Sequence, residues 1–233
     1  IFLENLKWTW RDMPFGRISL YERPDSAEQY IVAGDASEGI GNDEAAGLVL
    51  HKRLNTTCAI IAGQHSPEEL AAMLIGLGHY FNEAIIAQEN KGYGYQVNQL
   101  IFANYGNIYR KTIDKTGTND VTTELGFNTN SVTRPQVLAA MAAEIKQCST
   151  TLNAKELIAE CRTFIVKRDK DGKVTRVEAQ TGYQDGLVMC RAIAGYVRNQ
   201  YPYKPDLSLN LRSAQEKFAK EARLATTRNR YEG

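Results

Sequence analysis

The chain has 233 residues, 43% of them hydrophobic, which is enough for one domain to bury a sizeable core without staples. The formal net charge of +1 excludes a strongly basic protein, so any surface that binds nucleic acid must be local. The longest apolar runs are only a few residues, and we expect no membrane-spanning segment.

The two ends of the chain differ from its middle in composition. The start has neither an initiator Met nor a signal-peptide pattern, so we expect a piece of a longer protein. Aromatic residues and two prolines among polar residues predict an irregular arm or linker over 1–28. From Pro202 the chain is highly charged. We therefore expect a folded domain at 29–201 and a charged tail at 202–233.

Three short apolar segments open the expected domain. Residues 30–35 form a run that ends in an acid, which is typical of a buried strand. Residues 45–54 and 58–63 predict a second and a third strand, and Asn55 to Thr57 form a plausible turn between them. Three consecutive antiparallel strands are the simplest arrangement.

Helices and further strands follow. Ser66, Pro67 and Glu69 form a capping signature that predicts the start of a helix. The sequence then predicts a fourth strand that again ends in an acid, a helix and a short fifth strand, at 83–89, 95–105 and 108–112.

The second half of the chain is less regular at first. Residues 115–131 are polar and rich in Gly, Thr and Asn, which predicts a long loop. Alternating residues around the Lys170-Asp171-Gly172 turn predict a β-hairpin of 163–168 with 174–179. Helices are expected at 133–148, 154–161 and 184–200.

Three acids occupy the ends of predicted elements: Asp35 and Glu89 end strands, and Asp185 opens the last helix. An acid at a strand end is most often a turn or cap residue. If the first and fourth strands are parallel neighbours, however, two of these carboxylates lie side by side, and a divalent cation relieves their repulsion. Oxygen ligands without His or Cys favour Mg²⁺ or Mn²⁺, and two such ions can hydrolyse a phosphodiester with water.

Asp43 follows Asp35 after a Gly-containing loop. Two interpretations stay open. Asp43 is either an auxiliary fourth metal ligand or a turn residue that leads into the second strand, and the same alternatives hold for Glu38.

Three motifs in this order resemble a known family: Gly34-Asp35-Ala36-Ser37-Glu38-Gly39 with Asp43, Gln88-Glu89-Asn90-Lys91-Gly92-Tyr93-Gly94, and Gly182-Tyr183-Gln184-Asp185-Gly186. Over about residues 30–200 the chain resembles the C-terminal nuclease domain of the large terminase subunit of tailed bacteriophages. The resemblance implies an α/β, ribonuclease H-like fold, in which helices flank a central mixed five-stranded sheet with its first three strands antiparallel, plus an extra β-hairpin.

The resemblance also implies a site and a role. Asp35, Glu89 and Asp185 match the catalytic, metal-binding acids, and Asp43 matches a nearby acid. Many members carry a second acid or a His beside the last Asp, where this chain has Gln184 and Gly186. The implied activity is that of an endonuclease that uses two Mg²⁺ or Mn²⁺ ions to cut double-stranded viral DNA concatemers during packaging, in the cytoplasm of the infected bacterial host.

The implied partners are an N-terminal ATPase motor, the portal and the small terminase subunit. The motor is not expected within this chain, because no Gly-x-x-x-x-Gly-Lys-Ser/Thr motif occurs. We expect basic residues to contact the DNA phosphates. The candidates either rim a DNA groove or form an ordinary solvated surface, and they are Lys91, Arg134, Lys167, Arg168, Lys170 and Lys173.

Other functions remain open. A junction resolvase or transposase core would use the same acids on a different substrate. A non-catalytic module that docks on DNA or the portal would not need them. A sugar-kinase or actin-like ATPase also opens with a strand, an Asp and a Gly-rich loop, but its second phosphate loop is missing here.

Overall fold

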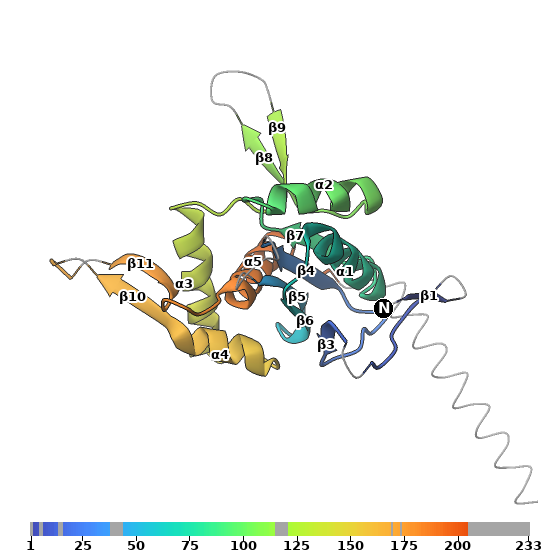
Figure 1. The fold of residues 1–233 in the computed structure, drawn as a ribbon, viewed down its shortest axis with the longest axis horizontal. Coiled ribbons are helices and arrows are strands. Elements are labelled where there is room, and N and C mark those ends of the chain that lie inside the picture. Colours follow the sequence, from blue (N-terminus) through green and yellow to red (C-terminus); the bar gives the residue numbers. More distant parts are fainter. Residues whose placement is uncertain are drawn as a thin grey trace, which may run out of the picture.

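A computed structural model of the protein describes residues 2–4, 7–13, 16–37, 44–114, 121–168, 170–172 and 174–204. A five-stranded sheet with the order β3-β6-β5-β4-β7 lies at its centre (Figure 1). The strands of this sheet are β3 (Ile18–Leu20), β4 (Tyr30–Asp35), β5 (Ala45–His51), β6 (Thr57–Gly63) and β7 (Ile85–Gln88).

The pairing within the sheet confirms the predicted mixed topology. Strands β4, β5 and β6 are consecutive and antiparallel, whereas β7 runs parallel to β4 with Gly34 opposite Gln88. The amide of Glu89 donates to the carbonyl of Gly34 at 2.8 Å and extends this register by one residue. The carboxyl ends of β4 and β7 therefore meet at one edge of the sheet.

The edge strand β3 corrects the prediction for the first 28 residues. It pairs antiparallel with β6, with Ile18 opposite Ile61, so the sheet begins in a segment that was expected to be irregular. Two further short strands, β1 (Phe2–Glu4) and β2 (Lys7–Thr9), pair with each other. Three residues are too few for a clear alternation in sequence, and the strand β3 forms because β6 offers it an open edge.

The segment predicted as a fifth strand, 108–112, does not form a strand of the central sheet. Only a single bridge joins Ile108 to Ile86. Beyond it, β8 (Arg110–Asp114) pairs antiparallel with β9 (Val121–Leu125) in a separate two-stranded hairpin. Strand β9 also interrupts the loop predicted at 115–131. Its Thr-rich sequence is polar, but Thr suits an exposed strand as well as a loop.

Helices cover both faces of the sheet (Figure 1). One face packs against α1 (Pro67–Tyr80) and α2 (Gly94–Asn104) through residues such as Val32 and Leu74. The other face packs against α3 (Thr133–Lys146), α4 (Lys155–Thr163) and α5 (Gly186–Gln200) through residues such as Ile31 and Ile193. Burial on both faces explains why the central strands are apolar at nearly every position.

Two local predictions are confirmed. Helix α1 begins with the expected capping box, in which Ser66 and Glu69 each accept a hydrogen bond from the other residue's backbone amide. The predicted hairpin forms from β10 (Phe164–Arg168) and β11 (Val174–Ala179), which pair antiparallel. Among the described residues, no helix combines the length and apolar character needed to span a membrane.

Helix α5 is held in place by a buried arginine. The side chain of Arg191 is 0% exposed. Its Nη2 atom lies 2.6 Å from Glu144 Oε2 on α3, 2.8 Å from Thr150 Oγ1 and 2.9 Å from Asn55 Oδ1 in the turn after β5. A single guanidinium thus connects α5 to α3 and to one end of the sheet, and α5 is the helix that begins directly after Asp185.

Candidate metal centre

The first two predicted acids are in direct contact. Asp35 is the last residue of β4 and Glu89 follows β7, and their carboxyl groups share a hydrogen bond. Burial raises the pKa of Asp35 well above its ordinary value of 3.8, and the Glu89 and Asp185 carboxylates raise it further, while Arg134 lowers it. Only 7% of Glu89 is exposed. Without a cation, two carboxylates are thus crowded at one edge of the sheet.

Gly94, the last residue of the second motif, lets the backbone of Glu89 lie close to the start of α2. A Cβ atom on Gly94 would lie 2.0 Å from the carbonyl oxygen of Glu89, which is backbone and cannot move aside. Because Gly94 opens α2, any larger residue there would push α2 away from the end of β7. The glycine at the end of the Gln88–Gly94 motif therefore allows the start of α2 to pack closely against the backbone of Glu89.

The first turn of α5 approaches the same edge. A Cβ atom on Gly186 would lie 3.8 Å from Asp35 Oδ2 and 2.8 Å from the Cβ of Ala46. The position beside Asp185 therefore has no room for a side chain. This packing gives a physical reason for Gly186, one of the two neighbours of Asp185.

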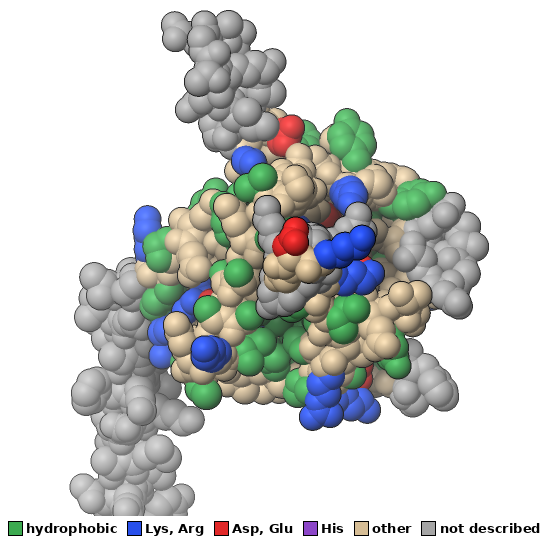
Figure 2. Space-filling view, turned by 90° about the vertical axis from the view of Figure 1, so that its left-hand side faces the viewer, with side chains coloured by type: hydrophobic (Ala, Val, Ile, Leu, Met, Phe, Trp, Pro, Cys, Tyr) green, Lys and Arg blue, Asp and Glu red, His purple; other side chains and the backbone are tan. Residues whose placement is uncertain are grey.

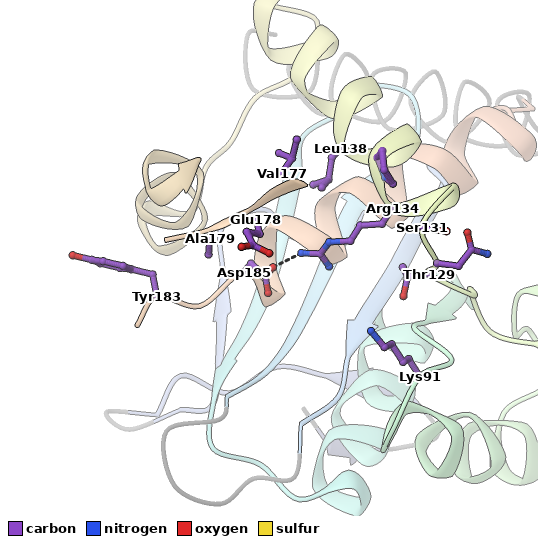
Figure 3. A pocket seen from close by; sticks show the side chains of 12 residues that line it. Lys91, Thr129, Ser131, Arg134, Leu138, Val177, Glu178, Ala179, Tyr183 and Asp185 are labelled. Atoms are coloured by element: carbon purple, nitrogen blue, oxygen red, sulfur yellow. Dashed lines mark hydrogen bonds and ion pairs between the residues drawn. The ribbon is translucent and has the colours of Figure 1, made fainter. Parts of the chain in front are cut away.

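The third acid, Asp185, has a different partner. It is the N-cap residue of α5, but its side chain accepts no capping hydrogen bond. Its carboxylate instead forms an ion pair with the guanidinium of Arg134, at the start of α3 (Figure 3). Both side chains are 32% exposed. The structure thus brings Asp185 into electrostatic range of Asp35 but pairs it with an arginine.

Among the residues that the structure describes, no three His, Cys, Asp or Glu side chains are grouped as a ready-made metal cage. Asp35 and Glu89 are together, whereas Asp185 is paired with Arg134. Asp43 and Glu38 lie outside the described residues. The roles of Asp35, Glu89, Asp185 and Asp43 as ligands therefore stay predictions.

One further acid near the site, Glu160 of α4, was missed in the sequence. Its Oε2 accepts from the amide of Val188 at 3.1 Å. Burial raises the pKa of Glu160 to about 7, amides of Val188 and Leu187 lower it, and Asp185 and Glu44 raise it. The available signal was its spacing, because Leu157, Glu160 and Cys161 share one half-buried helix face on which an acid is unexpected.

A groove of about 630 Å³ adjoins Asp185 (Figure 3). Lys91 and Arg134 line it, as do the turn before α3, the inner residues of β11 and Tyr183, whose side chain is 59% exposed. The contributions of Thr129, Glu178 and Tyr183 were not foreseen, because they depend on how the hairpin docks beside α3.

The remaining predicted basic residues lie on the hairpin. Lys167 forms an ion pair with Glu178 at 2.5 Å, and Lys170 is exposed at the turn. Lys173 and the side chain of Arg168 lie outside the described part of the structure. Figure 2 looks onto the side of the molecule from which this hairpin projects, and Lys and Arg side chains are spread across that face.

The strand order, the parallel β4–β7 pair and the helices on both faces define a ribonuclease H-like α/β fold. No protein-family model matches the sequence, and no curated protein matches it significantly. Solved large terminase nuclease domains share the fold, and the predicted resemblance to this group is thereby confirmed at the level of the fold.

Three of these structures illustrate the likeness. The large terminase nuclease of thermophilic phage G20c with bound cobalt is 18% identical, with a TM-score of 0.62 over 83% of this chain and 92% of that chain. The same nuclease with bound magnesium is 17% identical, with the same TM-score and coverage. The large terminase nuclease domain of Thermus phage P74-26 is 16% identical, with a TM-score of 0.60 over 82% of this chain and 89% of that chain.

Proposed function

We propose that this chain is a metal-dependent endonuclease that cuts double-stranded viral DNA concatemers during genome packaging. The observation that carries the proposal is the contact between Asp35 and Glu89 at the ends of adjacent parallel strands. It occurs in a fold shared with large terminase nucleases, one of which has been solved with bound magnesium and with bound cobalt. Buried acids in contact are rare unless a cation or a shared proton offsets their charge.

The side chains present fit divalent cations. Carboxylate oxygens are hard ligands, which favours Mg²⁺ or Mn²⁺ over softer metals. We propose that Asp35, Glu89 and Asp185 are the metal ligands, that Asp43 is a fourth ligand, and that the site binds two ions. Bound ions of this kind activate water and stabilise the leaving oxygen of a phosphodiester.

The protein's own groups hold the DNA in this proposal. Lys91 and Arg134 face the groove beside Asp185, where cations can contact phosphates without reading sequence. We assign the same role to the hairpin residues Lys167, Arg168, Lys170 and Lys173. We propose residues 29–201 as the nuclease domain, to which the β3 edge strand is added, and the charged sequence from 202 onward as a tail.

The wider setting also belongs to the proposal. The full-length subunit would join this domain to an N-terminal ATPase motor and act with the portal and the small terminase subunit in the cytoplasm of the infected bacterium. What supports this setting is the shared fold with phage terminase nucleases.

Plasmid digestion tests the proposal through Glu89. Wild-type protein is expected to cut supercoiled plasmid with Mg²⁺ or Mn²⁺ and to stop when EDTA is added. Glu89→Gln should lower the cleavage rate by more than about a hundredfold. Loss of a residue that only supports a metal ligand costs up to roughly a hundredfold, and loss of a ligand itself should cost more. Glu83→Gln is the matched control, because Glu83 is exposed and lies before β7, at the opposite end of that strand.

Two results would contradict the proposal. One is full activity in Glu89→Gln, and the other is no cleavage by wild type with any divalent cation. A parallel assay on four-way junctions separates a packaging nuclease from a junction resolvase, because a resolvase would cut the junction and spare linear duplex.

The Arg134–Asp185 ion pair gives a second prediction. Removing the guanidinium in Arg134→Gln frees the Asp185 carboxylate, so Mn²⁺ should bind about three- to tenfold more tightly in the absence of DNA. DNA affinity should fall, and its dependence on salt should become less steep by about one phosphate contact. Calorimetric titration of Mn²⁺ and filter binding at several salt concentrations measure the two effects.

Arg162→Gln is the control for this variant, since Arg162 is exposed on α4 and does not line the groove. Unchanged Mn²⁺ affinity in Arg134→Gln would show that the arginine does not compete for Asp185.

A further inference from the structure

The first turn of α5 is capped in an unusual way. The first amides of a helix have no partner within the helix, and the side chain of the N-cap residue commonly accepts from one of them. Asp185 occupies the N-cap position with a side chain well suited to that task. Its carboxylate nevertheless accepts no capping hydrogen bond and points to Arg134 (Figure 3).

The missing cap comes from a different helix. Glu160 of α4 accepts from the amide of Val188 at 3.1 Å, and the neighbouring amide of Leu187 also lowers the pKa of its carboxyl group. These two amides belong to the first turn of α5, where the backbone N–H groups have no acceptor within the helix. Glu160 thus performs for α5 the function that an N-cap side chain performs elsewhere.

We propose that Glu160 is a positioning residue for the metal centre, a cap supplied by a neighbouring helix that fixes the first turn of α5, so that the Asp185 carboxylate is not needed as the cap. The inference rests on the proposed metal-dependent activity and adds to it a residue outside the ligand set. It requires Glu160 to act through hydrogen bonds and not through its charge.

The packing around this turn shows why its position matters. Gly186 approaches Asp35 so closely that an added Cβ would lie 3.8 Å from Oδ2. A small shift of the turn therefore changes the distance between Asp185 and the Asp35–Glu89 pair. Displacements of about 1 Å at a site of this kind can lower rates by roughly a hundredfold.

Two substitutions separate a cap from a ligand. Glu160→Gln keeps an acceptor oxygen of nearly the same reach but removes the charge, whereas Glu160→Ala removes both. Glu156→Ala on the same helix is the control, because Glu156 contacts Tyr21 and not α5. Amide hydrogen exchange at Leu187 and Val188, calorimetric Mn²⁺ binding and plasmid cleavage are measured on each protein, together with the thermal midpoint.

A cap predicts a split between the two variants. Glu160→Ala should speed exchange of both amides, weaken Mn²⁺ binding about tenfold and raise the Mn²⁺ concentration needed for half-maximal cleavage. Glu160→Gln and Glu156→Ala should stay within about twofold of wild type in all three measurements.

The inference is overturned if Glu160→Gln loses Mn²⁺ binding as fully as Glu160→Ala, because the charge would then matter as in a ligand. It is also overturned if Glu160→Ala leaves exchange and binding unchanged. Should Glu160→Ala not fold, Glu160→Gln still decides, since only a cap predicts its near-normal binding. Wild-type protein that neither binds Mn²⁺ nor cuts DNA contradicts the proposed function instead, and amide exchange still tests the cap by itself.

Discussion

Replacement of Asp35 by Asn is expected to abolish metal-dependent DNA cleavage and to make the metal-free domain more stable. The activity falls because a neutral amide is a poor ligand for a hard cation, and we expect a loss of about a thousandfold or more. The stability rises because Asn removes a charge that is partly buried against Glu89 and Asp185. Function and stability therefore change in opposite directions, as is common at strained active sites.

The sign of the stability effect follows from the pKa of Asp35. This pKa is raised in the folded protein, so the folded state binds a proton more tightly than the unfolded chain does. The contribution of Asp35 to the free energy of unfolding is therefore fully present below its ordinary pKa and is lost as pH rises through the raised value. At neutral pH the ionised group destabilises the fold, and Asn should relieve this.

Thermal unfolding with and without Mg²⁺ measures the effect. Without metal, Asp35→Asn should melt at a higher temperature than wild type at pH 7, and the difference should shrink at low pH. Added Mg²⁺ should stabilise wild type through binding to the folded state but leave the variant unchanged. Glu83→Gln again serves as the exposed control. A variant that melts lower and still responds to Mg²⁺ would contradict the prediction.

Replacement of Arg191 by Met is expected to have the largest effect on stability. It leaves Glu144, which is only 15% exposed, without the cation at 2.6 Å, and it removes a donor from Asn55 and Thr150. Breaking a buried pair on one side costs about 3–5 kcal/mol. Urea denaturation should show this loss in the free energy of unfolding.

Two further variants test the cause. The double replacement Arg191→Met with Glu144→Leu removes both charges and should recover much of the lost stability, because apolar replacements of a buried pair are often neutral. Arg198→Met is the matched control, since Arg198 lies on the same helix, 3.8 Å from Glu144, but is partly exposed. Its cost should stay near 1 kcal/mol. A loss in the double variant as large as in Arg191→Met would show that the ion pair is not the cause, and would assign the effect to packing and to the lost hydrogen bonds of Asn55 and Thr150.

Local signals in the sequence predicted most of the central fold. Strands β4, β5 and β6 are apolar runs bounded by turns, and Ser66 to Glu69 mark the start of α1. Strand β3 could not be predicted in the same way, because three residues carry little pattern and their pairing partner lies about 40 positions away. The same limit applies to β9, whose hairpin partner gives it a strand conformation.

The candidate site likewise has one part that the sequence predicts and one part that it does not. Asp35 and Glu89 lie close together because each stands at the end of a strand and the two strands are parallel neighbours. Both the strands and their pairing can be predicted from the hydrophobic pattern and the usual topology of such sheets. The pairing of Asp185 with Arg134 and the cap from Glu160 depend on how α3, α4 and α5 pack together. Such contacts between helices are set by tertiary packing, for which a single sequence gives no spacing rule.

The crowding of Asp35 against Glu89 bears on how metal preference must be studied. Two carboxylates that repel each other are stabilised by almost any divalent ion, and first-row metals bind oxygen and nitrogen sites in an order that does not favour magnesium. If the pair binds a cation as proposed, purified protein is expected to carry whichever ion the growth medium and column supplied. Its preference can be measured only after chelation and reloading, with each ion offered at the concentration found in a bacterial cell.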